Sequence, residues 1–139
     1  MIDNNCAYCV EGDLVAKFGI KICELETSKV YLFKEQSHPG RCIVAHKKHV
    51  GDMNELTAEE RAAYFEDVAR VARAIMKAFN PDKVNYGAYG DTGHHLHFHL
   101  CPKYKDEYEW GGVFLMNPDK KYLTDEEYAA MIEKIKANL

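Results

Sequence analysis

Four of the seven histidines in this 139-residue chain lie close together, at His94, His95, His97 and His99. Because residues two apart on a β-strand point to the same side, His95, His97 and His99 are expected to line one face of a strand. Three imidazoles add little to a packed core, since each buried ring needs hydrogen-bond partners. One structural histidine would be ordinary, but this alternation indicates a functional site.

Two kinds of chemistry suit such a face. The rings can ligate a catalytic metal ion, or one neutral imidazole can attack an electrophile while its neighbours position the substrate. Histidine spacing alone does not separate these two chemistries. The preceding segment 85–93 contains Gly87, Gly90 and Gly93. An ordinary turn is the commoner role of such a loop, but its backbone amides can also hold a phosphate, which favours phosphoryl or nucleotidyl transfer.

The elements that position this face include several strands. β-prone runs at 14–18, 29–33 and 41–45 are separated by polar, glycine or proline residues, which predicts an antiparallel meander. A further strand is predicted at 96–100, where apolar residues and histidines alternate. The segment 110–123 has no clear period, so no element is predicted there.

Two helices are predicted from their first residues and their apolar spacing. The first follows Thr57 and ends before 80–82, and the second follows Thr124, where Leu123 and Tyr128 are placed to form a hydrophobic staple. The expected buried face of the first helix contains Phe65, Val68, Ala72, Ile75, Met76 and Phe79.

Composition narrows the classes of function. The chain has 18 basic and 22 acidic residues, so its net charge of −4 argues against a protein that binds a nucleic acid polymer mainly through phosphate neutralisation. No apolar run approaches the roughly 18 residues that span a bilayer, so no membrane partner is expected. The first residues lack the pattern of a secretory leader, and we therefore expect the cytoplasm.

Three segments carry a resemblance to a known family. The residues Gly-Asp-Thr-Gly-His-His-Leu-His-Phe-His-Leu-Cys-Pro at 90–102 resemble the signature of the histidine triad (HIT) family. The segment 6–9 resembles the family's N-terminal C-x-aromatic-C. The segment 41–50 resembles its G-H-x-L-V-I-P-K-K-H-I strand. The three segments occur in the family's order and cover residues 6 to 102.

The resemblance implies an α+β fold with an antiparallel sheet of about five strands, one long helix and a C-terminal helix. It also implies a single HIT domain over 1–139, with a family core at about 6–102 and a variable segment at 103–139. Relatives commonly form twofold dimers, so a homodimer is expected.

The resemblance also implies a reaction. His97 would attack the α-phosphate of a nucleotide, either a phosphoramidate or a dinucleoside polyphosphate, to form a nucleotidyl-histidine intermediate that water hydrolyses. A neutral imidazole needs orientation on its other nitrogen more than activation, and a backbone carbonyl supplies this in relatives. His99 would contact phosphate oxygens and Thr92 would lie near the leaving group. No catalytic cofactor is implied.

Four further residues are expected to bind substrate. By resemblance, Asn85 would hold phosphate or sugar, and Glu35 would reach the ribose hydroxyls. Asp91 stands where many relatives have glutamine, and a carboxylate facing a phosphate is repulsive unless it is protonated, turned away or paired. Tyr8 lies where an aromatic residue of relatives touches the base, although core packing is an equal alternative.

Cys6 and Cys9 have the C-x₂-C spacing of two thiolates that share a metal ion, which is half of a tetrahedral site. In zinc-containing relatives the other two ligands correspond to His49 and His95. The resemblance therefore implies a structural zinc, whereas free thiols are the alternative.

Two other functions remain open. A metal-dependent hydrolase would use His95, His97 and His99 as three ligands, but it leaves the two cysteines unexplained. A nucleotide-binding regulatory module would keep the pocket and turn over little.

Overall fold

The computed structural model describes residues 3–139 and has an α+β fold. A five-stranded antiparallel sheet has the order β1-β2-β3-β5-β4. Its strands are β1 (Gly19–Glu24), β2 (Ser28–Phe33), β3 (Cys42–His46), β4 (Lys83–Gly87) and β5 (His97–Lys103). The helices are α1 (Ala7–Val10), α2 (Asp13–Ala16), α3 (Ala58–Phe79) and α4 (Asp125–Lys136), with a short 3-10 turn η1 (Met53–Glu55). The predicted fold class is confirmed.

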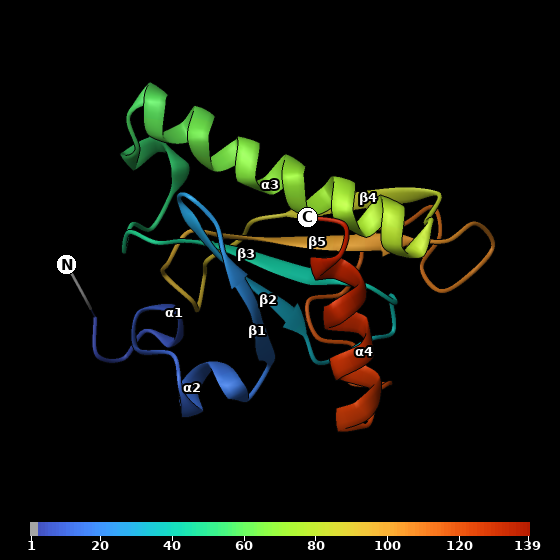
Figure 1. The fold of residues 1–139 in the computed structure, drawn as a ribbon. Helices are drawn as coiled ribbons and strands as arrows, with labels where there is room; N and C mark the ends of the chain where they lie inside the picture. Colours follow the sequence, from blue (N-terminus) through green and yellow to red (C-terminus); the bar gives the residue numbers. More distant parts are fainter. Residues whose placement is uncertain (1–2) are drawn as a thin grey trace.

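The long helix α3 crosses one face of the sheet, and the short helices α1 and α2 lie on the other side (Figure 1). Alternation along each strand separates two groups of buried side chains. Val44 and Leu100 face α3, whereas Ile43 and Ala45 pack with Tyr8 from α1. The central strands β2 and β3 are therefore buried on both faces.

The run 14–18, predicted as a strand, is instead mostly helical. Asp13–Ala16 forms α2, and β1 begins only at Gly19. Short apolar runs do not distinguish a strand from a helix. Here Val15 is buried in the cluster around Tyr8, and Phe18 lies with its ring centroid 5.8 Å from that of Tyr8.

The expected buried face of α3 is also partly wrong. Phe65 and Met76 are 37% and 40% exposed, whereas Tyr64 and Val71 are completely buried. The face that meets the sheet is turned by about one residue from the predicted stripe. The Tyr64 hydroxyl donates to the carbonyl oxygen of Val44 at 2.7 Å, which places Tyr64 on the side of α3 that meets the sheet.

Both predicted helix starts are found. The side chain of Thr57 accepts from the backbone N–H of Glu60, and Thr124 and Glu127 form both bonds of a capping box. Tyr128 at the start of α4 is buried, and its hydroxyl donates to the carbonyl of Lys34 at 2.6 Å. No helix in residues 3–139 is long and apolar enough to cross a membrane.

Candidate active site and metal centre

His97 and His99 are neighbours on the sheet face opposite α3. Both lie on β5, where His97 pairs with Ala45 and His99 pairs with Ile43 of β3. Because directly paired residues of antiparallel strands project to the same side, both rings join the face that α1 covers. Their ring centroids are 5.5 Å apart.

His95 departs from the sequence prediction because it does not belong to the strand. β5 begins at His97, and a turn closed by the bond from His95 N–H to the Gly93 carbonyl, 2.7 Å long, precedes it. The ring of His95 still lies 5.4 Å from that of Tyr8. The turn directs it toward the N-terminal arm rather than along the row of His97 and His99.

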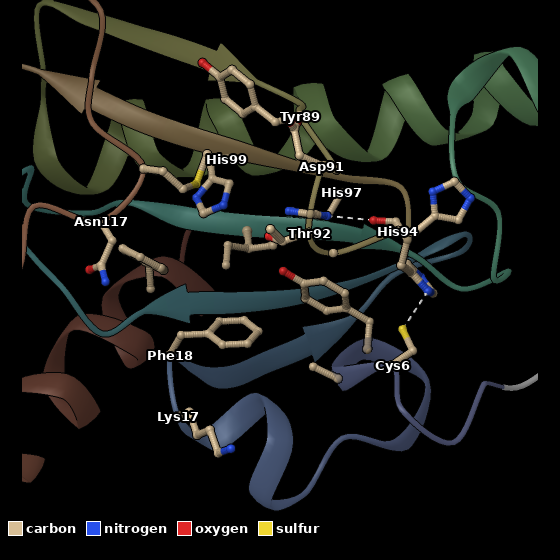
Figure 2. Close-up of a pocket in the computed structure, with 18 of the residues that line it drawn as sticks. Cys6, Lys17, Phe18, Tyr89, Asp91, Thr92, His94, His97, His99 and Asn117 are labelled. Atoms are coloured by element: carbon tan, nitrogen blue, oxygen red, sulfur yellow. Dashed lines mark hydrogen bonds between the residues drawn. The ribbon is translucent and has the colours of Figure 1, made fainter.

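The hydrogen bond of His97 determines which nitrogen faces the pocket. Its Nδ1 lies 2.6 Å from the carbonyl oxygen of His95, as the dashed line in Figure 2 marks. A carbonyl only accepts, so Nδ1 carries the proton and Nε2 keeps a free lone pair. Burial lowers the pKa of His97, and this effect exceeds the opposing effect of the carbonyl, so the ring is neutral at pH 7.

His99 is held by a residue that the sequence analysis did not single out. Arg41 Nη2 and Nε lie 3.0 Å and 3.3 Å from Nδ1 of His99. Arginine only donates, so Nδ1 of His99 is the acceptor and the proton is on Nε2. Burial, and then the positive charge of Arg41, lowers the pKa of His99 to about 2. The only indication of this role in the sequence is that Arg41, a charged residue, directly precedes the apolar run 42–45.

These histidines open onto a cavity of about 950 Å³. Its walls come from the N-terminal arm, the ends of β2 and β5, the loop 89–95 and the segment 113–117. Thr92 and Asp91 lie on the loop that crosses the cavity beside His97, and Asn117 is on the opposite wall (Figure 2). The cavity therefore brings together His97, His99 and Thr92, the residues predicted to act on substrate.

The four predicted substrate-binding residues are placed differently from one another. Asp91 and Tyr8 both line the cavity, but Asp91 is exposed whereas Tyr8 is 6% exposed and packs 4.9 Å from the His97 ring. Asn85 is on β4, opposite Cys101 of β5, and is not among the residues that line the cavity.

Glu35 borders the cavity, but its carboxylate is already hydrogen-bonded within the chain. It is 2% exposed and accepts from the backbone of Ser37, Lys120 and Lys121 at 3.0, 2.8 and 2.9 Å, and from the Ser37 hydroxyl. Burial raises the pKa of Glu35, but these hydrogen bonds outweigh burial and hold the pKa below its usual value. In this arrangement Glu35 ties the end of β2 to the segment before α4.

The second cluster of the site contains Cys6, Cys9, His49 and His95, whose potential ligand atoms all lie within 4.8 Å of one another. The Cys6 Sγ and His95 Nδ1 atoms are 3.3 Å apart, as are Cys9 Sγ and His49 Nδ1, and the two imidazole Nδ1 atoms are 3.1 Å apart. Tetrahedral zinc with ordinary bond lengths places sulfur and nitrogen ligands about 3.6 Å apart and two nitrogens about 3.3 Å apart. The four residues therefore fit a closed zinc site.

A second contact supports that fit. His95 Nε2 lies 2.6 Å from the carbonyl oxygen of His46, which places its proton on Nε2 and leaves Nδ1 free to bind a metal ion. Burial lowers the pKa of His95 to about 4, so the ring is neutral, as a metal ligand must be. The predicted ligand set is thus brought together at the edge of the cavity.

Taken together, the fold and the site define a small α+β protein with an imidazole-lined cavity beside a thiol and imidazole cluster. The HIT domain model matches residues 19–106. This chain therefore belongs to the histidine triad family.

Curated relatives include two named enzymes. The chain is 28% identical over 144 residues to an adenosine 5′-monophosphoramidase of Schizosaccharomyces pombe, covering 97% of this chain and 98% of the relative. It is also 28% identical over 76 residues to a bis(5′-adenosyl)-triphosphatase of Dictyostelium discoideum, covering 51% of each.

Solved structures share the fold. A histidine triad protein from Sinorhizobium meliloti has a TM-score of 0.84 at 23% identity, over 92% of this chain and 95% of that one. A zinc-bound histidine triad family protein from Mycobacterium smegmatis has a TM-score of 0.67 at 21% identity, over 95% and 94% of the two chains.

Proposed function

We propose that this protein hydrolyses or transfers a nucleotide at its α-phosphate, with His97 as the nucleophile. The observation that carries the proposal is the 2.6 Å contact between His97 Nδ1 and the His95 carbonyl, which leaves the Nε2 lone pair for attack. The phosphoramidase and triphosphatase relatives both act on adenine nucleotides by their names, and this supports a phosphoramidate or dinucleoside polyphosphate as substrate.

The reaction has two displacements. In the first, Nε2 of His97 forms a bond to the α-phosphorus, and the bond to the leaving group breaks with its electron pair, after which the leaving group takes a proton from solvent. In the second, water attacks the same phosphorus, releases a proton, and the phosphorus–nitrogen bond breaks back to Nε2. The products are a nucleoside monophosphate and the free leaving group.

Other cavity residues are assigned supporting roles. The Nε2–H of His99 donates to a phosphate oxygen, and the hydroxyl of Thr92 lies at the leaving-group side. The ring of Tyr8 supports the His97 ring and the floor of the cavity. Asp91 is exposed on the loop, which lets its carboxylate turn away from the phosphate or pair with a cationic leaving group. Glu35 can bind substrate only if it gives up some of its hydrogen bonds to Ser37, Lys120 and Lys121, and Asn85, which does not line the cavity, can bind substrate only if the cavity wall moves.

The test is detection of the covalent intermediate. Purified protein is incubated with adenosine 5′-phosphoramidate labelled at phosphorus and quenched in base, where a phosphorus–nitrogen bond survives. The wild type is expected to carry a label, and His97→Gln is expected to lose the label and at least about 1,000-fold in kcat.

The control for this variant is its affinity for AMP. Glutamine keeps a polar side chain of similar size, so His97→Gln should bind AMP within about fivefold of the wild type. Binding of AMP without any turnover or adduct in the wild type, across phosphoramidates and dinucleoside polyphosphates, would favour the regulatory binding module instead.

A metal-dependent hydrolase is less well supported. Of the three rings it requires, His95 faces the thiols, whereas His97 and His99 are hydrogen-bonded to a carbonyl and to Arg41. Within residues 3–139, the only cluster suited to a metal ion is the one that contains Cys6, Cys9, His49 and His95.

We also propose that this cluster holds a structural zinc ion. With four protein ligands the ion has no open position for substrate. When bound, it would link the N-terminal arm to the sheet. The zinc-bound relative supports the assignment.

We also propose a cytoplasmic location. The cysteines of the described chain form no disulfide, which suits a reducing compartment.

A homodimer is proposed on the exposed sheet edge. β4 is the edge strand of the sheet, and its residue Tyr86 is 51% exposed, while Met76 on α3 is 40% exposed. They line a shallow groove with residues of α3. Sedimentation equilibrium of the wild type and of Tyr86→Lys tests this proposal, because a charge in that groove should shift a dimer toward monomer.

A further inference from the structure

Arg41 is a buried cation without an acidic partner. Its side chain is inaccessible to solvent, and no carboxylate of residues 3–139 lies within 4.0 Å of its guanidinium nitrogens. The guanidinium instead lies over the ring of Phe33, with 4.2 Å between its central carbon and the ring centroid. A buried charge is costly unless an opposite charge compensates it. The residue is therefore arranged to meet an anion that the chain itself does not contain.

The nearby carboxylates are committed to other groups. Glu109 lies 2.6 Å from His38 Nε2 and also accepts from the N–H of Leu115, and Glu35 accepts from the backbone of 120–121. Arg41 directs its remaining donors to the carbonyl oxygens of Leu115 and Met116, at 3.1 and 2.8 Å. These groups are neutral, so they accept hydrogen bonds from the guanidinium without compensating its charge.

The imidazole of His99 separates this charge from the cavity. Arg41 donates to Nδ1, so the opposite ring nitrogen, Nε2, carries a proton on the side away from the guanidinium. The positive charge of Arg41 polarises this N–H and makes it a stronger donor to an anion, while the His99 ring itself stays neutral. An oxygen that accepts from Nε2 thereby gains a charge-assisted hydrogen bond.

We propose that Arg41 is a positioning residue that acts through His99 to select a phosphorylated nucleoside over an unphosphorylated one. This inference rests on the proposed function and deepens it, because it names the group that supplies positive charge to the phosphate site. Arg41 stands where the family strand pattern has the histidine of G-H-x-L. An arginine keeps its charge at any physiological pH, which a histidine does not.

A purely structural role is the competing explanation. Through Leu115 and Met116 the guanidinium also holds the cavity wall, so removing it loosens the space for the whole nucleoside. The two roles differ in what they do to adenosine, which has no phosphate. Loss of the wall weakens AMP and adenosine alike, whereas loss of the charge weakens AMP alone.

The experiment measures the dissociation constants of AMP and adenosine by calorimetry for the wild type, Arg41→Met and Arg41→Lys. Arg41→Met is expected to weaken AMP about 10- to 100-fold more than adenosine. Arg41→Lys, which keeps the charge, should recover at least part of the preference for AMP. Equal losses for both ligands in Arg41→Met would overturn the role of Arg41. Failure of the wild type to bind AMP would overturn the proposed function.

A spectroscopic measurement on the wild type keeps the inference testable if the variants do not fold. In wild-type protein labelled with ¹³C and ¹⁵N at pH 7, the His99 ring signals are assigned by through-bond correlation to the assigned backbone of His99, so no variant is needed. The expected spectrum shows an unprotonated Nδ1 and a protonated Nε2. A proton on Nδ1 of His99 would overturn the relay, whatever the enzyme activity.

Discussion

His95 and His99 are each two residues from His97, but they make opposite contacts. His95 Nε2 lies against a carbonyl, which directs its Nδ1 toward two thiols. His99 accepts at Nδ1 from Arg41, which directs a proton on Nε2 away from that contact. One ring therefore offers a lone pair to a metal ion and the other offers a donor to an anion. The partner of one ring nitrogen therefore decides whether the other nitrogen of a histidine presents a lone pair or an N–H.

The cluster around Cys6 and Cys9 should contribute more to the stability of the fold than the residues around Arg41. Cys9→Ser removes one ligand of the proposed zinc site and frees the arm that contains α1, so we expect a loss of about 2–5 kcal/mol and a melting temperature lower by roughly 10 °C. Zinc content per chain and thermal unfolding measure these effects. Cys23→Ser, at a half-buried thiol outside the cluster, is the control and should keep its zinc. Full zinc content in Cys9→Ser would contradict the ligand set.

Near Arg41, the buried carboxylate of Glu35 should make a smaller contribution to stability, and this contribution should depend on pH. At pH 7 we expect Glu35→Gln to lose about 1–2 kcal/mol in urea unfolding, because the amide cannot accept from all the donors that meet the carboxylate. A carboxyl whose pKa is lowered in the folded state stabilises above its unfolded pKa. This stabilisation is lost as the pH falls through the folded pKa.

The difference between wild type and Glu35→Gln should therefore be complete above about pH 5 and shrink below about pH 4. Glu107→Gln, at an exposed position of the C-terminal segment 103–139, is the control and should change stability by less than about 0.5 kcal/mol at either pH. A difference that stays constant from pH 7 to pH 3 would exclude the ionised carboxylate as its source.

The smallest change in stability is expected at α4, away from both the metal cluster and Arg41. Thr124→Ala removes the N-cap of α4 and should cost about 1 kcal/mol, without altering zinc content or the preference for AMP over adenosine. Urea unfolding together with those two binding measurements checks this. A change in zinc content or in the preference for AMP would show that the N-cap of α4 affects the cavity, and the contributions of the metal cluster and of Arg41 would then not be independent of α4.

The features that sequence predicted well depend on nearby residues. The capping sites at Thr57 and Thr124 are local patterns, and the alternation at 97–100 specifies a strand because its period is short. The pairing of the 6–9 cysteines with His49 and His95 came from family resemblance rather than from spacing. Its placement in space is what the structure adds.

The features that sequence missed depend on distant contacts. Arg41 and His99 are 58 residues apart, and the carbonyls that Arg41 also meets lie in a segment without periodicity. No local pattern predicts such a contact. The short run 14–18 failed for the opposite reason, because its apolar residues satisfy a helix and a strand equally and tertiary packing decides between them.

The strand order has a consequence for how the chain folds during synthesis. β3 is hydrogen-bonded on one side to β2 and on the other to β5, which follows it only after α3 and β4. A nascent chain that ends before residue 97 therefore exposes one edge of β3, and unpaired strand edges promote association between chains. The strand that carries His97 closes that edge, so completion of the sheet and creation of the imidazole pair are one event.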